Sequence, residues 1–268
     1  MTFSLHDSID PNGFIDSNDY ILYSTPTSTA ATRENMHILR EKLQIPDASG
    51  LIGRPRLNSL LEKSLAHFPA TLITGRSGTG KTALATVFAS NFTNVAWYSV
   101  ESTDLAWPIF SRYFSASQAG DSNDGDVTGP TERQTERQVE RTEIAQFLVS
   151  CSSLSRAGEG SPSLIVLDDV HHVFDTPWFE DFLNLLLYSL PTGTHLLLLC
   201  RSEPPSPLWR LRSKQMLNVI DEKVIAFNAE ETGELFNSLN LPKTKAKEAQ
   251  RQSFGRVSKL LQFANDCL

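Results

Sequence analysis

Short apolar runs alternate with stretches of helical periodicity through the middle of the chain. Four of them cover residues 70–74, 94–100, 163–169 and 194–201, and a fifth covers residues 223–227. Continuous apolar runs of this length, bounded by turn-forming residues, indicate strands that are buried on both faces of a parallel sheet. The repeated β-α order predicts an α/β fold of three layers, with a mostly parallel five-stranded sheet between two layers of helices.

The helical stretches lie between these runs. One begins with Pro55 in its first turn and carries an apolar stripe of Leu57, Leu60, Leu61 and Leu65. Proline fits the first turn of a helix, and this leucine spacing places the four side chains on one face. We predict further helices at residues 34–43, 104–114, 131–154 and 176–190, and one that starts after an N-cap at Asn228, with Glu231 three positions later.

The composition divides the chain into segments. Residues 1–33 show no period, and we predict a flexible leader, followed by one domain over residues 34–240. Within that domain, residues 115–131 are mostly Ser, Gly, Asp, Asn and Gln, which predicts a disordered insertion. The polar stretch 132–138 fits a solvated helix better than a partner-binding or nucleic-acid-binding arm. Residues 241–268 predict a C-terminal helical segment, either docked on the domain or the start of a truncated following domain.

One glycine-rich stretch joins the first predicted strand to the helix after it and has the spacing G-x-x-x-x-G-K-[ST]. Its residues, all candidates for nucleotide binding, are Gly75, Arg76, Ser77, Gly78, Thr79, Gly80, Lys81 and Thr82. Glycines at this spacing let successive backbone N–H groups point into one concavity at the start of a helix, where an anion binds. Lys81 is then a point charge for the β- and γ-phosphates, and the Thr82 hydroxyl is a ligand for Mg²⁺.

Two later strands end in charged residues that complete such a site. Asp168 and Asp169 follow the third apolar run, and Arg201 follows the fourth. Ligands of parallel sheets bind at the carboxyl ends of strands, so we expect Asp168 to hold Mg²⁺, Asp169 to orient or activate water, and Arg201 to sense the γ-phosphate. We assign no metal to His171 and His172, because Mg²⁺ prefers oxygen ligands.

Composition narrows the class of protein. The 268 residues carry a formal net charge of -7, which argues against direct nucleic-acid binding by this chain. The three cysteines lack the spacing of a zinc site or disulfide framework and fit a reducing compartment. Neither a signal peptide nor a run long enough to span a membrane is present, so we expect a cytoplasmic protein.

Several segments together resemble one family. They are residues 38–46, 53–57, 75–82, 97–101, 167–171 and 201–205. The chain resembles the nucleotide-binding module of STAND-class signal-transduction ATPases, in the branch of LuxR-type transcription regulators similar to the maltose-regulon activator. The resemblance implies a P-loop NTPase fold of the additional-strand, AAA-like type, with ATP or ADP and Mg²⁺ as ligands and the nucleotide used as a switch. By the same resemblance, Arg54 touches the nucleotide from the N-terminal side.

The chain also departs from that family. The winged helix, helical-repeat sensor and DNA-binding motif that usually follow are not readable before Leu268. DNA binding is therefore not carried over, and we expect a protein partner or further domains, together with nucleotide-dependent self-association. We expect weak Mg²⁺-dependent ATPase activity that resets a regulatory switch. Two alternatives stay open at this point: a P-loop kinase acting on a small molecule, and an interaction module that does not use nucleotide.

Overall fold

The computed structural model describes residues 38–119, 140–151 and 163–267, all within one compact unit. The predicted leader and most of the predicted insertion lie outside these ranges. The strands are β1 (Ala70–Thr74), β2 (Asn94–Ser99), β3 (Ser163–Asp168), β4 (Thr194–Cys200) and β5 (Leu217–Ile220). The helices are α1 (Pro55–His67), α2 (Lys81–Ala89), α3 (Trp107–Ala119), α4 (Arg141–Ser150), α5 (Phe179–Ser189), α6 (Ser206–Ser213), α7 (Glu222–Ile225), α8 (Ala229–Ser238), α9 (Lys243–Ser253) and α10 (Val257–Asn265), with short 3-10 turns η1 (Arg40–Leu43) and η4 (Val170–Val173).

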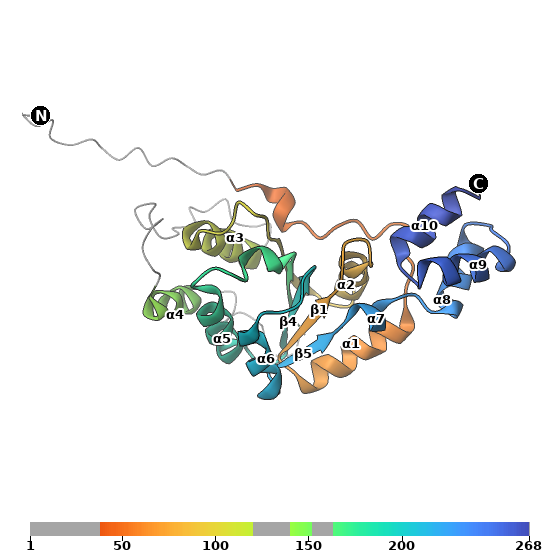
Figure 1. The fold of residues 1–268 in the computed structure, drawn as a ribbon. Coiled ribbons are helices and arrows are strands. Elements are labelled where there is room, and N and C mark those ends of the chain that lie inside the picture. The colour runs from red at the N-terminus through yellow and green to blue at the C-terminus, as the bar shows by residue number, and fades with distance from the viewer. Residues whose placement is uncertain (1–37, 120–139, 152–162, 268) are drawn as a thin grey trace, which may run out of the picture. The chain divides into compact units, whose positions relative to one another are not determined.

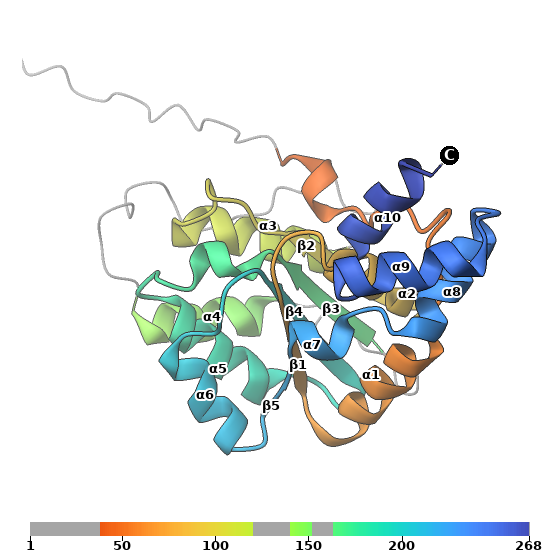
Figure 2. The ribbon, with the colours of Figure 1, turned by 45° about the vertical axis from the view of Figure 1, so that its right-hand side comes forward.

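The five strands form one sheet in the order β2-β3-β4-β1-β5 (Figures 1 and 2). Every pairing in it is parallel. Strand β4 lies between β1, which leads into the glycine-rich loop, and β3, which ends at Asp168. This is the additional-strand arrangement that the family resemblance implied, and the predicted α/β fold with a five-stranded, mostly parallel sheet is confirmed.

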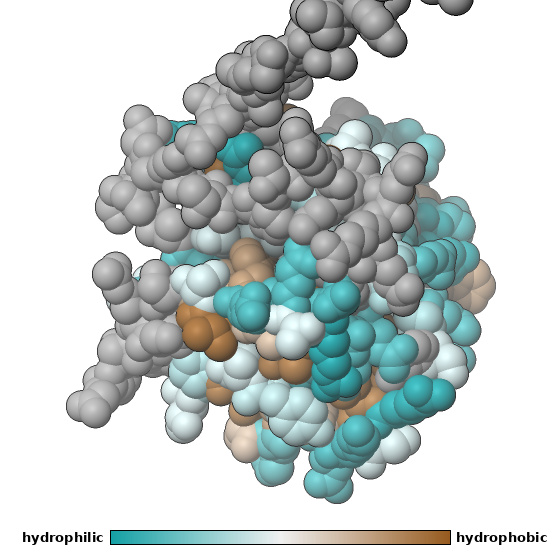
Figure 3. Space-filling view, turned by 90° about the vertical axis from the view of Figure 1, so that its left-hand side faces the viewer, coloured by the Kyte–Doolittle hydropathy of each residue, from teal (hydrophilic) through white to brown (hydrophobic). Residues whose placement is uncertain are grey.

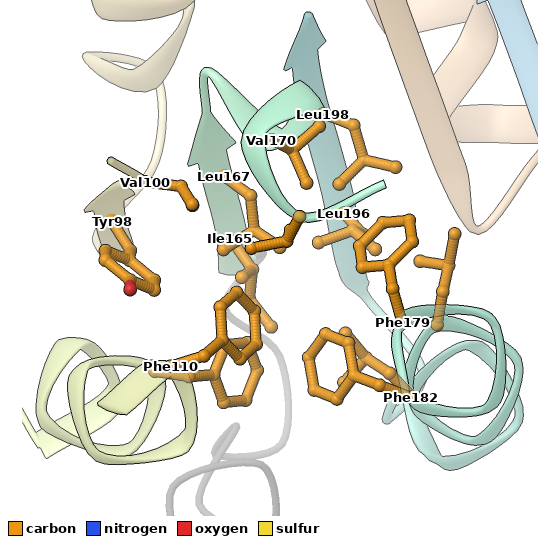
Figure 4. Packing of buried hydrophobic residues seen from close by; sticks show 14 of the residues in the cluster. Tyr98, Val100, Phe110, Ile165, Leu167, Val170, Phe179, Phe182, Leu196 and Leu198 are labelled. Atoms are coloured by element: carbon orange, nitrogen blue, oxygen red, sulfur yellow. The ribbon is translucent and has the colours of Figure 1, made fainter. Parts of the chain in front are cut away.

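Alternation along the strands divides the core between the two faces of the sheet. In β3, Ile165 and Leu167 point to one face, and Leu164 and Val166 point to the other. The first face packs against α3, α4, α5 and α6, and Figure 4 shows aromatic rings of α3 and α5 in contact with it. The second face packs against α1 and α2. A sheet that is apolar on both faces needs both layers of helices, which explains the continuous apolar runs of its strands.

Helices α8, α9 and α10 share a third apolar cluster, which is separate from those on the sheet. Phe236 and Leu260 are fully buried in it, and Phe227 joins it from the linker before α8. Helix α8 begins with the predicted capping box, in which Asn228 accepts the Glu231 N–H and Glu231 accepts the Asn228 N–H. We call α8, α9 and α10 the helical bundle.

The predicted position of the fifth strand was wrong. The apolar run at 223–227 is not a strand, because Glu222–Ile225 form α7, and β5 is Leu217–Ile220. The side chain of Asp221 accepts the N–H of Val224 at 3.0 Å and so starts a helical turn where an apolar run alone favoured a strand.

Other element boundaries also differ from the prediction. Helix α3 continues to Ala119, so the first residues of the predicted insertion, 115–119, are helical, and residues 120–131 lie outside the described ranges. The predicted helix at 131–154 is described only as α4, flanked by Glu140 and Cys151. Of the predicted helix at 34–43, residues 38–43 are described, and only the 3-10 turn η1 at Arg40–Leu43 is helical.

One face of the molecule shows both polar and apolar residues (Figure 3). On the side where α3 and α4 lie in Figure 1, hydrophilic residues surround smaller apolar areas (Figure 3). The longest helices of the described ranges, α1 and α3, have 13 residues, and none is long and apolar enough to cross a membrane.

Candidate functional site

The sheet topology brings the predicted site residues to one edge. Strands β1 and β3 both pair with β4, so the carboxyl ends of these three strands are adjacent. Gly75 directly follows β1, Asp169 follows β3, and Arg201 follows β4. Residues that are far apart in the sequence therefore lie together where ligands of open parallel sheets bind.

The glycine-rich loop curls because two of its glycines adopt left-handed backbone conformations. Gly78 has φ +76° and Gly80 has φ +90°, which other residues rarely adopt. Gly80 is the N-cap of α2, so the unpaired N–H groups of the first turn of α2 are directed toward the loop. The loop thus has the geometry of an anion site, with the positive end of a helix dipole behind it.

Lys81 lies inside this loop. Its ammonium group donates to the carbonyl oxygens of Gly75 at 2.6 Å and Arg76 at 3.1 Å, and the Thr79 hydroxyl also donates to Arg76 at 2.9 Å. Burial lowers the pKa of Lys81, and the nearby carboxylates of Asp169 and Asp168 act against that shift. The cation is therefore held by backbone dipoles of the loop that it is predicted to serve.

Thr82 and Asp168 are hydrogen-bonded to each other. The Thr82 hydroxyl donates to Asp168 Oδ2 at 2.8 Å, and Asp168 Oδ1 accepts the N–H of Asp169 at 2.8 Å. Burial raises the pKa of Asp168, although the Thr82 hydrogen bond lowers it. A hydroxyl and a carboxylate oxygen, brought together from α2 and β3, are the hard oxygen donors that Mg²⁺ prefers, so these residues fit the predicted ion.

Asp169 and Arg201 form an ion pair beside them. Arg201 donates through Nε to Asp169 Oδ1 at 2.8 Å and through Nη2 to Oδ2 at 2.5 Å. This two-bond geometry is the strong form of an arginine-carboxylate pair. Asp169 itself has φ +52°, a left-handed backbone that turns the chain into η4. The two residues predicted to activate water and to sense the γ-phosphate are thus each other's partner.

The neighbouring histidines are packed against each other. The rings of His171 and His172 have centroids 4.3 Å apart, and His171 Nδ1 is 3.8 Å from Asp169 Oδ1. Burial lowers the pKa of His171, and His172 adds to the shift. Among the described residues, no group of three or more His, Cys, Asp or Glu side chains is arranged to hold a metal ion.

Sequence reasoning missed several residues that contact the loop from outside. Glu222 of α7 accepts the backbone N–H of Arg76 at 3.0 Å and its guanidinium at 2.6 Å, a bond that lowers the pKa of Glu222 to about 2. Arg256 donates to the Ser77 carbonyl, and the Ser258 N–H donates to the Gly78 carbonyl at 3.1 Å. No spacing rule relates these residues to the loop.

Arg54, which the family resemblance placed near the nucleotide, is bonded to other parts of the protein in this structure. Its guanidinium donates to the carbonyls of Ile225 at 2.7 Å and Ala226 at 3.0 Å and to Glu231 at 2.6 Å. Arg56 also binds Glu231, at 3.1 Å. These bonds tie the start of α1 to the linker before the helical bundle, and they give no support to an Arg54 contact with nucleotide.

Solved structures to which the chain is similar include several ATPases. The chain is 14% identical to the Walker-type ATPase of Pyrococcus abyssi, with a TM-score of 0.45, over 79% of this chain and 66% of that one. It is 18% identical to a signal transduction ATPase with numerous domains from Pyrococcus horikoshii that has a tetratricopeptide repeat sensor, with a TM-score of 0.50, over 82% of this chain and 30% of that one. A Thermotoga maritima RuvB variant matches at 16% identity and a TM-score of 0.44, over 80% and 61%.

The chain therefore spans less than two thirds of the length of these proteins, and at such identities the likeness concerns the fold alone. The sequence family gives the stronger result. The model of the AAA ATPase domain matches residues 54–199, which include the glycine-rich loop, Asp168 and Asp169. Because this match covers more than half of the chain, the protein belongs to the AAA ATPase domain family.

Proposed function

We propose that this ATPase domain binds Mg-ATP at residues 75–82 and acts as a slowly hydrolysing regulatory switch. The observation that carries the proposal is the pairing of Asp169 with Arg201 beside the Thr82–Asp168 pair. A switch needs a group that distinguishes ATP from ADP. A ligand that has equal affinity for both states of the protein does not change their populations. In this structure Arg201, which we predict to sense the γ-phosphate, is bonded to Asp169, which we predict to activate water.

The loop supplies binding that ATP and ADP share. The left-handed glycines and the start of α2 direct backbone N–H groups at the β-phosphate. Lys81 exchanges its two carbonyl acceptors for phosphate oxygens, which are charged and so bind an ammonium more strongly. Thr82 and Asp168 would hold Mg²⁺, which would neutralise negative charge of the phosphate chain.

Arg201 supplies binding that only ATP receives. Its side chain is 49% exposed, so the guanidinium can turn from Asp169 to a γ-phosphate at the same edge of the sheet. Asp169 then loses its cation and is free to accept a proton from water as the water oxygen attacks phosphorus and ADP leaves. ADP has no γ-phosphate, so the Asp169–Arg201 pair persists. The two nucleotides thereby favour two arrangements of the β3 and β4 ends.

Calorimetric titration with ATP and ADP, with and without Mg²⁺, tests this function. We expect ATP to bind more tightly than ADP, Lys81→Ala to weaken both, and Arg201→Gln to weaken ATP alone. At 100 times its Kd, a nucleotide that binds only the native state raises the free energy of unfolding by about 2.7 kcal/mol, which a melting curve detects. Equal affinity of the wild-type chain for ATP and ADP would contradict a switch, and unchanged binding by Lys81→Ala would contradict the site.

We also propose the setting of this switch. The family resemblance supports a signal-transduction ATPase of the LuxR-type regulator branch, located in the cytoplasm, with residues 34–240 as nucleotide domain and residues 241–268 leading toward a partner or a further domain. Nucleotide-dependent self-association belongs to the same proposal. Light scattering after gel filtration tests it, since a mass that is equal with ATP and ADP would contradict self-association.

A further inference from the structure

A cavity of about 170 Å³ lies between α5 and α6. Figures 1 and 2 both show these two helices side by side, and both pack on the face of the sheet that α3 and α4 also cover. Apolar side chains make up most of the lining, among them Phe179 and Leu183 of α5 and Leu208 of α6. Because an apolar cavity of about 150 Å³ is large enough to bind benzene, this cavity can accept a single hydrocarbon ring.

The polar side chains of the cavity supply hydrogen-bond acceptors. Thr176 donates its hydroxyl to the Val173 carbonyl at 2.7 Å, so its oxygen remains an acceptor. Asn184 donates through Nδ2 to the main-chain carbonyl of Glu180 at 2.8 Å, and its Oδ1 is the acceptor of that amide. A ligand that carries N–H groups complements such a lining.

The third polar side chain of the cavity adds a negative charge. Glu180 is 46% exposed, and its carboxylate is 3.6 Å from the Nη1 of Arg210, which is 74% exposed. An exposed pair at this separation is weak, so the carboxylate can bind a second cation. The cavity therefore combines space for an apolar ring with a charge that favours an ammonium group.

The walls of the cavity continue directly into the candidate nucleotide site. On one side, η4 connects Asp169 to Phe174, which lines the cavity. On the other side, a short connection leads from Arg201 to Pro205, which lines the cavity and is the N-cap of α6. The cavity thus lies between the two segments that leave β3 and β4, and the Asp169–Arg201 pair joins the beginnings of these segments.

We propose that this cavity is a regulatory binding site for a small amine that carries one hydrocarbon ring. The ring lies among the apolar side chains, and the ammonium group binds Glu180. The binding itself goes beyond the proposed function, whereas its coupling to nucleotide rests on that function. The cavity is present while Arg201 is bonded to Asp169, so a bound amine favours this arrangement. It therefore weakens the binding of ATP, whose γ-phosphate takes Arg201 from Asp169 in the proposed switch, and leaves ADP unaffected.

Three probes of similar shape and different charge test the site. Benzylamine, benzyl alcohol and benzoate are titrated into the full chain at pH 7, and binding is followed by NMR chemical shifts. We expect benzylamine to bind with a Kd of about 1 mM, as suits so small a ligand. Benzyl alcohol should bind about three-fold more weakly, because it has no charge for Glu180, and benzoate should bind most weakly. Equal affinities for the three probes, tightest binding of benzoate, or no binding at all would overturn the proposal.

Two neighbouring acidic residues of α5 form a matched pair of variants. Glu180→Gln should weaken benzylamine binding about three-fold and leave benzyl alcohol unchanged. The control Asp181→Asn should bind as the wild type does, because Asp181 also faces an arginine, Arg141 at 3.4 Å, but does not line the cavity. Equal losses of benzylamine affinity in the two variants would overturn the role of Glu180.

A third variant fills the cavity. Leu208→Trp should weaken the binding of both benzylamine and benzyl alcohol at least about ten-fold, because the ring then has no apolar space to enter. A melting curve checks that this variant folds. Because Glu180 is half-exposed, the pair Glu180→Gln and Asp181→Asn decides the question even where Leu208→Trp does not fold. Unchanged affinity in a folded Leu208→Trp protein would place the probes elsewhere and overturn the site.

Nucleotide tests the coupling. A saturating, non-hydrolysable MgATP analogue should weaken benzylamine binding at least about five-fold, and MgADP should not change it; by reciprocity, benzylamine weakens the analogue by the same factor. Equal benzylamine affinity with and without the analogue would overturn the coupling. An effect of benzylamine on the analogue that persists in Leu208→Trp would show competition at the glycine-rich loop and would overturn it as well. A chain that binds benzylamine in the expected order but binds no nucleotide would support the site and refute the proposed function.

Discussion

A buried histidine near the amino end of the central strand β4 predicts how the stability of the fold changes at acidic pH. His195 is 4% exposed near the start of β4, and its Nε2 is 2.9 Å from the hydroxyl of Thr71 in β1. Thr71 in turn is 2.6 Å from the hydroxyl of Ser64 in α1, which accepts from Asn218 of β5 at 2.9 Å. One chain of hydrogen bonds thus joins three strands and a helix, and a charged imidazole would lie inside it.

Burial lowers the pKa of His195 to about 4, from an ordinary value of 6.5. Between these values the unfolded chain binds a proton that the folded chain excludes, so stability falls as the pH drops through this window. A difference of 2.5 pH units corresponds to a loss of about 3 kcal/mol in the free energy of unfolding. The loss begins near pH 6.5 and is complete near pH 4.

Urea unfolding of the wild type and of His195→Gln between pH 7.5 and pH 4.5 measures this effect. Glutamine keeps a hydrogen-bonding group beside Thr71 but does not titrate, so the pH dependence of stability should be shallower by most of that amount. Glu222 and Glu231, whose pKa values are lowered to about 2, lose their contribution only at lower pH. Parallel curves for the wild type and His195→Gln would refute the reasoning.

Two further substitutions test the packing of the helical bundle. Gly255→Ala should lower the free energy of unfolding by at least about 2 kcal/mol, because Gly255 has φ +76° and the added Cβ would overlap the Phe227 carbonyl. The control Gly50→Ala, also at φ +76° but in open space, should lower it by about 1 kcal/mol. Equal losses for the two variants would contradict this account. Glu231→Gln should cost about 3–5 kcal/mol in the same urea assay, because it leaves the buried Arg54 guanidinium without its anion, and a change below 1 kcal/mol would contradict a buried pair.

The strands were predictable where apolar pattern and burial coincide. Residues 163–168 and 194–200 place apolar side chains on both faces of the sheet, because helices cover both faces. Such a short continuous apolar run is typical of a central strand in a parallel sheet. Residues 223–227 show where pattern fails. Their apolar side chains are compatible with a strand or a turn of helix, and the choice follows from the Asp221 cap and from Arg54 and Arg56, which bind nearby carbonyls.

The sequence could predict the part of the candidate site that depends on side-chain types, but not the part that depends on backbone contacts. Lys81 at the start of a helix, and Asp168 and Arg201 at the carboxyl ends of strands, have residue types and positions that indicate phosphate chemistry from the sequence alone. The contacts of Ser258 and Arg256 use backbone acceptors, which every residue provides. Their spacing from the loop depends on how the helical bundle folds back, which no local pattern reports. The ion pair of Asp169 and Arg201 could not be predicted either, because the sequence places both residues at the carboxyl ends of strands but does not show that their side chains are in contact.

We expect Arg201 and Arg256 to make separable contributions to nucleotide affinity, and a double variant tests that separation. Arg201 bonds to Asp169 at the end of β3, whereas Arg256 bonds to Ser77 in the loop, so the two arginines share no hydrogen-bond partner. Arg201→Gln should remove the preference for ATP over ADP, and Arg256→Gln should weaken both nucleotides equally. Because independent sites add in free energy, the double variant should show both effects multiplied together. A double variant that binds ATP no more weakly than Arg256→Gln alone would show that the terminal phosphate is read through the loop rather than through Arg201.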